Sequence, residues 1–141
     1  MKPMKHFKLY ELVDPQTYET KGAKAWEHFT EDILFSLDGL RDFFGRPVTV
    51  NNWMAGGQFL FRGYRPPWYF GGAKLSQHRL GNAFDCDVAG MPANQARKEI
   101  IDHQDDPRLI MITRMENTVT WLHIDCGPVP EGQHRIYLFN P

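Results

Sequence analysis

Both the fold and the chemistry of this chain are decided by one stretch, Ser76-Gln77-His78-Arg79-Leu80-Gly81-Asn82-Ala83-Phe84-Asp85-Cys86-Asp87. It sets an imidazole, His78, seven residues before a carboxylate, Asp85, with small residues between them. A second imidazole, His123, follows later in the chain. Two histidines and one carboxylate are a common ligand set for a catalytic zinc ion that keeps water as its fourth ligand. The sequence therefore predicts a Zn²⁺ site at these three residues.

The predicted strands around these residues bring the polar groups together. Residues 83–88 and 119–125 are both predicted to be strands, and side chains alternate between the two faces of a strand. If the two strands are neighbours, one face of the sheet collects the acidic and imidazole groups Asp85, Asp87, His123 and Asp125. Cys86 and Cys126 then fall on the opposite face. We interpret them as buried small hydrophobes rather than as zinc ligands.

The spacer inside the motif also has a predicted role. Gly81 permits an unusual backbone conformation and a close approach, so that His78 and Asp85 can reach the same ion. Ser76, two residues before His78, is predicted to hydrogen-bond beside the ligand and support it. The remaining histidines have no such context and are interpreted as surface or structural residues: His6, His28, His103 and His134.

The rest of the chain predicts helices and short strands. Apolar residues recur at steps of three and four over residues 23–44, which predicts a core helix that ends at Gly45-Arg46-Pro47. A second helix is predicted from Pro92 to about His103. Residues 7–13 predict a short strand or an extended arm, followed by a turn at Asp14-Pro15. The other predicted strands are 48–53, 83–88, 109–113, 119–125 and an edge strand at 135–139, with Glu116-Asn117 as the connection before 119–125.

This order predicts an α+β fold with a mostly antiparallel sheet. The 141 residues fit one domain, with an N-terminal arm over residues 1–20 and a core over about 23–127. The formal net charge of −1 argues against broad electrostatic binding to nucleic acid or to anionic membranes. No apolar run reaches the length of a membrane span. The basic start of the chain lacks the apolar segment of a secretory signal, so synthesis in a reducing cytoplasm is expected.

A long loop over residues 55–74 is rich in glycine, proline and aromatic residues. Loops of this length inside a compact domain are usually functional or disordered, and the aromatic content favours function. It contains two arginines, Arg62 and Arg65. The aromatic residues in and beside the loop fit two interpretations equally, the walls of a ligand groove or packing on the domain: Trp53, Tyr64, Trp68 and Tyr69.

The motif Ser76-x-His78-x-x-Gly81-x-Ala83-x-Asp85, followed by His123-Ile124-Asp125, resembles the M15 family of zinc peptidases. These are D-alanyl-D-alanine carboxypeptidases and L-alanyl-D-glutamate endopeptidases of bacteria and phages. The resemblance covers about residues 23–127 and is strongest from Gly71 to Asp87. It implies a sheet domain shared with the hedgehog signalling domain, and zinc ligands at His78, Asp85 and His123.

The resemblance also implies an arginine before the motif that binds a substrate carboxylate. Arg65 lies in a Gly-Tyr-Arg triplet of the kind that the family uses, whereas Arg62 has the more usual spacing to Gly71-Gly72. Both stay candidates, and Ser76 is a third candidate for substrate contact.

One position departs from the family pattern. Many members carry an acidic residue or a histidine as general base three residues before the second histidine ligand, and here that position is Thr120. The nearest substitutes are Glu116, Asp87 and Asp125. We predict Glu116 as the general base and Asp125 as the carboxylate that orients a ligand histidine.

The implied activity is zinc-dependent hydrolysis of a peptide bond that involves a D-amino acid in peptidoglycan. A phage lysin or virion component fits this activity, as does a bacterial enzyme acting on cell-wall fragments. Thr120 favours the alternative of a non-catalytic zinc-containing binding or virion structural domain. A hedgehog-like interaction module is a third hypothesis. The sequence leaves the bond cleaved and the oligomeric state open.

Overall fold

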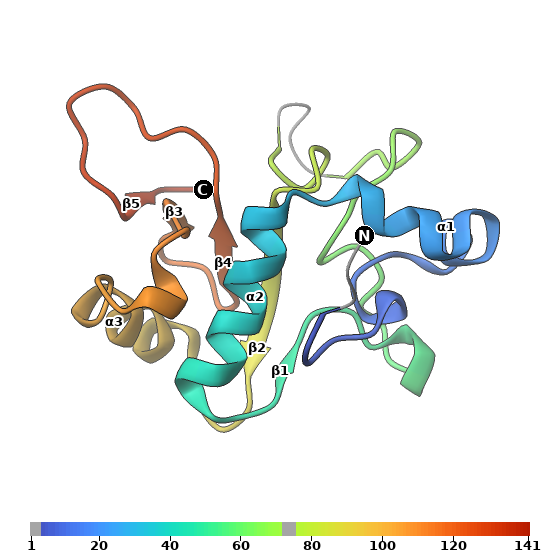
Figure 1. Cartoon of the computed structure of the whole chain (residues 1–141), viewed down its shortest axis with the longest axis horizontal. Coiled ribbons are helices and arrows are strands. Elements are labelled where there is room, and N and C mark those ends of the chain that lie inside the picture. The colour runs from blue at the N-terminus through green and yellow to red at the C-terminus, as the bar shows by residue number, and fades with distance from the viewer. Residues whose placement is uncertain (1–3, 72–75) are drawn as a thin grey trace.

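The computed structural model describes residues 4–71 and 76–141. Its α-helices and strands are α1 (Pro15–Lys21), α2 (Glu31–Phe44), α3 (Ala93–Asp102), β1 (Val48–Thr49), β2 (Ala83–Val88), β3 (Arg114–Glu116), β4 (Leu122–Asp125) and β5 (Tyr137–Phe139). The strands form one sheet in the order β1-β2-β4-β3-β5 (Figure 1). The β3–β5 pair is parallel and the other pairs are antiparallel. The α+β prediction with a mostly antiparallel sheet is therefore confirmed, in a single compact domain.

Two short segments, residues 1–3 and 72–75, lie outside the described residues. They include the start of the basic N-terminal segment and part of the Gly71–Ser76 stretch that contributed to the resemblance. The Gly71-Gly72 spacing used for Arg62 therefore also falls partly outside them. Among the described helices, none has both the length and the apolar character that crossing a bilayer requires.

The core helix begins later than the apolar pattern predicts. Residues Gly22–His28 form a 3-10 helix, and α2 begins only at Glu31. Thr30 separates the two because its hydroxyl accepts a hydrogen bond from the backbone N–H of Ile33, 3.2 Å away, as an N-cap residue does. The helix then ends at Gly45, which adopts the left-handed conformation. The predicted apolar stripe still faces the core, where Ile33 and Leu37 are fully buried.

The N-terminal segment differs from the extended arm or strand that was predicted. Leu9–Glu11 forms a 3-10 helix, and Phe7, Leu12 and Val13 are buried in the core. The predicted turn at Asp14-Pro15 is instead the start of α1, because the Asp14 carboxylate accepts a hydrogen bond from the N–H of Thr17. Aspartate followed by proline is a helix-start signal as well as a turn signal, and here the helix forms.

The strand predicted at 109–113 is also misplaced. Asp106 caps a 3-10 helix at Pro107–Leu109, and this turn packs against α2, so Leu109 and Ile112 are buried without joining the sheet. The strand forms five residues later as β3, which includes Glu116 from the predicted connection. The predictions near 48–53, 119–125 and 135–139 correspond to the shorter strands β1, β4 and β5. The second helix has Pro92 as its N-cap rather than inside its first turn.

The two faces of the sheet have different neighbours. The hydroxyl of Ser36, on α2, lies 3.6 Å from the sulfur of Cys126, and the ring of Phe29 stacks on Phe84 of β2. Helix α2 therefore packs on the face that carries Cys86 and Cys126, and it lies in front of β2 in Figure 1. Cys86 is fully buried there, as predicted, whereas Cys126 is only partly buried, because it lies just past the end of β4. The polar residues of β2 and β4 face the other side.

Gly81 sets the turn that brings His78 back to β2. Its φ is +64°, and a Cβ atom there would lie 1.7 Å from the carbonyl oxygen of His28. Both the left-handed backbone and the close contact therefore require glycine. The conformation and the close approach predicted for this residue are both present.

We expect Gly81→Ala to destabilise the protein by more than about 3 kcal/mol, because the backbone strain of about 1–2 kcal/mol adds to a clash with rigid backbone. Gly45→Ala is the matched control, since Gly45 has φ +62° with nothing within 4 Å of the added Cβ. It should lose only the strain component. Urea denaturation of both variants measures the difference, and equal losses would contradict this account of the turn.

Candidate metal centre

Three side chains from the turn, β2 and β4 meet on the polar face of the sheet. His78, Asp85 and His123 each offer a ligand atom, and these atoms lie within 4.8 Å of one another. Nε2 of His78 is 3.3 Å from Oδ2 of Asp85, and Nδ1 of His123 is 2.8 Å from Oδ1 of the same carboxylate. All three residues are buried. Asp85 and His123 are direct partners in the antiparallel register, so the predicted convergence of the two strands is present.

A hydrogen bond on the side of the ring away from Asp85 fixes the orientation of His78. Its Nδ1–H donates a hydrogen bond of 2.9 Å to the carbonyl oxygen of Gly63, which leaves Nε2 facing Asp85. The hydroxyl of Ser76 accepts a hydrogen bond of 3.2 Å from the backbone N–H of His78. Ser76 thus supports His78 as predicted, and it does so by a hydrogen bond to the backbone of His78 rather than to its imidazole ring. Such supporting contacts select the ring nitrogen that binds a metal.

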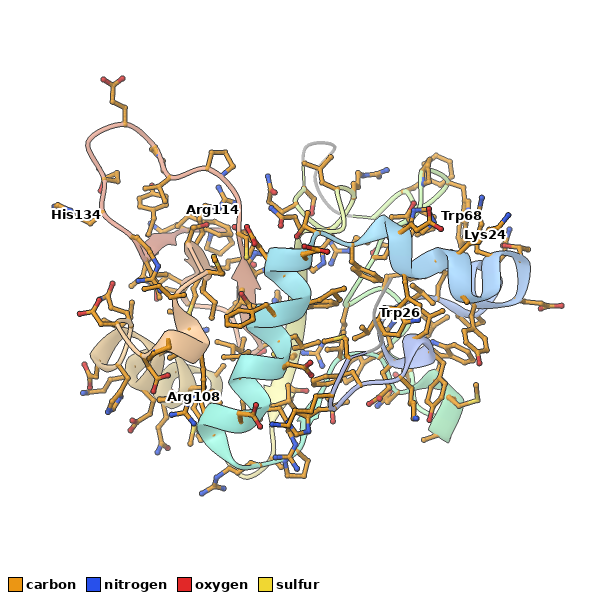
Figure 2. The ribbon with its side chains drawn as sticks, in the orientation of Figure 1. Lys24, Trp26, Trp68, Arg108, Arg114 and His134 are labelled. Carbon is orange, nitrogen blue, oxygen red and sulfur yellow. The ribbon has the colours of Figure 1, made fainter. Side chains whose placement is uncertain are left out.

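His123 is oriented by Asp125. Nε2 of His123 lies 2.7 Å from Oδ2 of Asp125, so Nδ1 is the nitrogen left for a metal. Asp125 is fully buried, and its carboxylate also accepts hydrogen bonds from Nε (2.8 Å) and Nη2 (3.0 Å) of Arg114 and from the N–H of Gly127. Arg114, labelled in Figure 2, comes from β3. The supporting contact predicted for Asp125 is present, and Arg114 is a partner that the sequence reasoning missed.

These contacts set the charges of the site. Burial lowers the pKa of His78, which favours its neutral form. Burial acts against the charge of His123 as well, but its hydrogen bonds to Asp125 and Asp85 raise the pKa to about 9. The two histidines hold the pKa of Asp85 well below its usual value despite burial, and His123 and Arg114 do the same for Asp125. Both aspartates are therefore ionised at neutral pH.

The ligand group forms one side of a cavity of about 410 Å³. Glu116 and Arg114 from β3, Trp121 beside β4, Phe139 from β5 and Arg65 from the long loop line the cavity with it. The ring of Phe139 packs edge-on against that of His123, with 5.4 Å between the ring centroids. The guanidinium carbon of Arg114 lies over the same Phe139 ring, 4.5 Å from its centroid. The C-terminal strand therefore contributes directly to the site.

The structure separates the two candidate arginines. Arg65 lines the cavity, and its Nη2 is 3.3 Å from Oδ2 of Asp85. Arg62 forms a bidentate pair with Asp87 at 2.9 and 3.2 Å, lies over the ring of Phe59, and is not among the cavity residues. Asp87, one of the three carboxylates considered as a substitute for the general base, is half-exposed and binds Arg62.

The candidate general base also has a definite position. Continuing the register that pairs Met115 with Ile124 places Glu116 beside His123, and Glu116 lines the cavity. Partial burial raises the pKa of Glu116, against the effect of the nearby His123 charge. Thr120, the position where the family carries its base, is exposed and is not among the cavity residues.

The aromatic residues that line the cavity are not the ones that the sequence analysis considered in and beside the long loop. Among the described residues, Trp121 and Phe139 line this cavity, and the four loop candidates do not: Trp53, Tyr64, Trp68 and Tyr69. Trp121 was within reach of sequence reasoning, because it lies two residues before His123 and alternation puts it on the same face. Phe139 gave no such signal, since it reaches the site only through the parallel pairing of β5 with β3.

The donor set fits a divalent transition metal. Neighbouring ligand atoms of a tetrahedral zinc ion with bonds of about 2.0–2.1 Å lie roughly 3.3 Å apart. The 3.3 Å between Nε2 of His78 and Oδ2 of Asp85 matches that spacing, and the three candidate ligand atoms all lie within 4.8 Å of one another. Two imidazoles and one carboxylate also leave a coordination position for water or substrate.

Comparison of the chain with protein-family models, with curated proteins and with solved structures found no match.

Metal binding should depend on pH in a defined direction. His123 is protonated below about pH 9, and a metal ion binds only the neutral ring, so binding displaces a proton. We expect zinc affinity to rise by about tenfold per pH unit between pH 6 and 8. Competition with a chelator at several pH values measures how the zinc affinity changes with pH. The pH dependence of the chelator's own zinc affinity is measured separately and subtracted.

Two variants test the assignment of the ligands. His78→Ala should lose most of the affinity at every pH, because only two ligands remain. Asp125→Asn should flatten the slope, because the hydrogen bond that raises the pKa of His123 is weakened. A parent protein that takes up no zinc at pH 8 would refute the metal site.

Proposed function

We propose that this protein is a zinc-dependent peptidoglycan hydrolase of the M15 type, which cleaves a peptide bond involving a D-amino acid. The observation that carries the proposal is the ligand group His78, Asp85 and His123 on the side of a cavity that also contains Glu116 and Arg65. A metal, a carboxylate base and a cation for substrate are the parts that such a hydrolysis needs. The proposed fold is that of the hedgehog and D-Ala-D-Ala-peptidase group.

Zinc held by the three ligands would supply Lewis-acid polarisation of the scissile carbonyl and an acidified water. Glu116 is the base in this proposal: its carboxylate takes a proton from the attacking water and delivers it to the leaving amine. The pKa of Glu116 is raised toward neutral pH, so its carboxyl group can exchange a proton more readily there. This suits a group that first accepts a proton and then donates it. Asp125 and Arg114 keep His123 in its binding orientation.

Arg65 is the proposed clamp for a substrate carboxylate. Its Nε–H donates to the carbonyl oxygen of Phe61 and its Nη2 contacts Asp85, which holds the guanidinium at the cavity wall. Trp121 offers a second contact, since its buried indole N–H has no hydrogen-bond partner among the described residues. A buried donor without a partner beside a cavity is suited to a substrate carbonyl.

A non-catalytic metal-binding domain, in a virion or elsewhere, is the alternative, and Thr120 at the family's base position favours it. The presence of Glu116 in the cavity favours the enzyme. In the hydrolase proposal, the protein works as a phage lysin released to the cell wall, as a virion component, or on cell-wall fragments inside a bacterium.

Glu116→Gln should keep its zinc and lose turnover by about a hundredfold or more, because removal of a general base costs roughly 10²–10⁴ in rate. The assay is digestion of purified peptidoglycan with mass spectrometry of the released muropeptides. Glu131→Gln, the same change at an exposed position, is the control and should match the parent. If the zinc-loaded parent protein releases no fragment, the hydrolase proposal is wrong and the non-catalytic metal-binding domain is the remaining hypothesis.

The two arginines should differ sharply. Arg65→Ala should lower kcat/KM roughly ten- to a hundredfold through loss of a charged hydrogen-bonding partner. Arg62→Ala loses the pair with Asp87 and the contact with Phe59, both outside the cavity, but keeps the backbone hydrogen bond to Asp85, so its activity should stay close to that of the parent. Zinc content is measured in both variants, because Arg65 also contacts Asp85. Equal activities at equal zinc content would rule out the carboxylate clamp.

A further inference from the structure

A second cavity of about 310 Å³ lies on the far side of the chain segment that borders the metal centre. Tyr64 lines this second cavity and the next residue, Arg65, lines the first. The same segment holds the metal site in place, because the carbonyl oxygen of Gly63 orients His78 and the N–H of Arg65 donates to the backbone oxygen of His78. Consecutive residues of this segment therefore line different cavities, and the segment forms a partition between them.

Part of the lining of the second cavity is apolar. Trp68 is 43% exposed, and its ring lies edge-on to the ring of Phe61, with 5.7 Å between the ring centroids. Pro66 also lines the cavity. Tyr64 and His28 also line the cavity, and their rings stack at 4.2 Å with an interplanar angle of 5°. Two of the loop aromatics for which a groove wall and packing on the domain were both open, Tyr64 and Trp68, thus line this cavity.

Helix α1 contributes polar groups to the lining of this cavity. Gln16 and Thr20 are exposed amide and hydroxyl side chains, and Lys21, at the end of the helix, adds one cationic side chain. Among the residues that line the cavity there is no carboxylate, and burial lowers the pKa of His28 toward the neutral form. This lining offers nothing to compensate a cationic ligand. It combines aromatic rings with amide, hydroxyl and ammonium donors, which match the apolar C–H face and the polar rim of a sugar ring.

We propose that this cavity is a subsite for an N-acetylated amino sugar of a glycan strand. The inference rests on the proposed function in one respect: peptidoglycan joins its peptides to such sugars, so the neighbouring cavities would take the two parts of one substrate. Figure 2 shows Trp68 on the right of the view and Arg114, from the metal centre, on the left. A substrate that occupies both cavities therefore lies across the partition formed by residues 63–65.

The test uses N,N′,N″-triacetylchitotriose, which contains the sugar and no peptide, so that binding is measured independently of hydrolysis. We expect the full chain to bind it, with NMR shift changes on residues 16–21 and 64–68. Trp68→Ala should weaken binding roughly three- to tenfold, the loss expected for one aromatic contact. Phe70→Ala is the matched control, since Phe70 is 95% exposed in the same loop and is not among the residues of this cavity. Gln16→Ala provides a second variant at an exposed helix position.

The outcomes separate this inference from the proposed function. Binding that is weakened in Trp68→Ala and unchanged in Phe70→Ala supports the sugar subsite, even if the parent releases no muropeptide and the hydrolase proposal fails. Cleavage of peptidoglycan without chitotriose binding at millimolar concentration overturns the subsite and leaves the hydrolase proposal standing. Shift changes confined to other residues, or a cavity that binds a proline-rich peptide and not the sugar, also overturn it.

Discussion

The antiparallel register of β2 with β4 is the constraint on which the rest of the structure depends. It pairs Asp85 with His123, and because side chains alternate, a slip of one residue would move the acidic and imidazole groups to the opposite face. Apolar burial holds the register, since Phe84 and Ile124, also paired, are fully buried on the side covered by α2. The packing of the core therefore positions the polar site, and a residue far from the cavity can affect its chemistry through this pairing.

Charge compensation explains why so many ionisable groups tolerate burial here. Asp85 and Asp125 share the His123 ring, and each carboxylate has its own arginine, Arg65 and Arg114. Buried charges are costly unless they are paired and hydrogen-bonded, and each of these carboxylates has several partners. A dication bound by the ligand group would replace the proton of His123 as the positive charge between the two carboxylates. Hydrogen bonds from Nδ1 of His78 to the carbonyl of Gly63 and between His123 and Asp125 hold the two histidine rings in place, which reduces the side-chain ordering that metal binding must supply.

The long loop serves two places at once. Its backbone between Gly63 and Arg65 fixes His78, while its side chains divide between the two cavities. Arg62 anchors the loop to β2 through Asp87, and its carbonyl oxygen accepts a hydrogen bond from the N–H of Asp85. The loop is therefore attached directly to the strand that carries Asp85, a candidate metal ligand. This explains how a segment without regular structure can position groups at the candidate site.

The sequence by itself determined the ligand set, the strand that carries Asp85, the need for glycine at position 81 and the inward face of the core helix. These features are local, because spacing, alternation and turn chemistry depend on neighbouring residues. Tertiary structure decided which arginine enters the cavity, that Glu116 and not Thr120 faces it, and that Arg114 and Phe139 complete the site. It also moved a predicted strand to β3, since burial under α2 outweighed the strand propensity of residues 109–113. Those outcomes depend on which distant segments of the chain pair with one another. The local sequence of a strand does not reveal its pairing partner, so they could not be predicted from it.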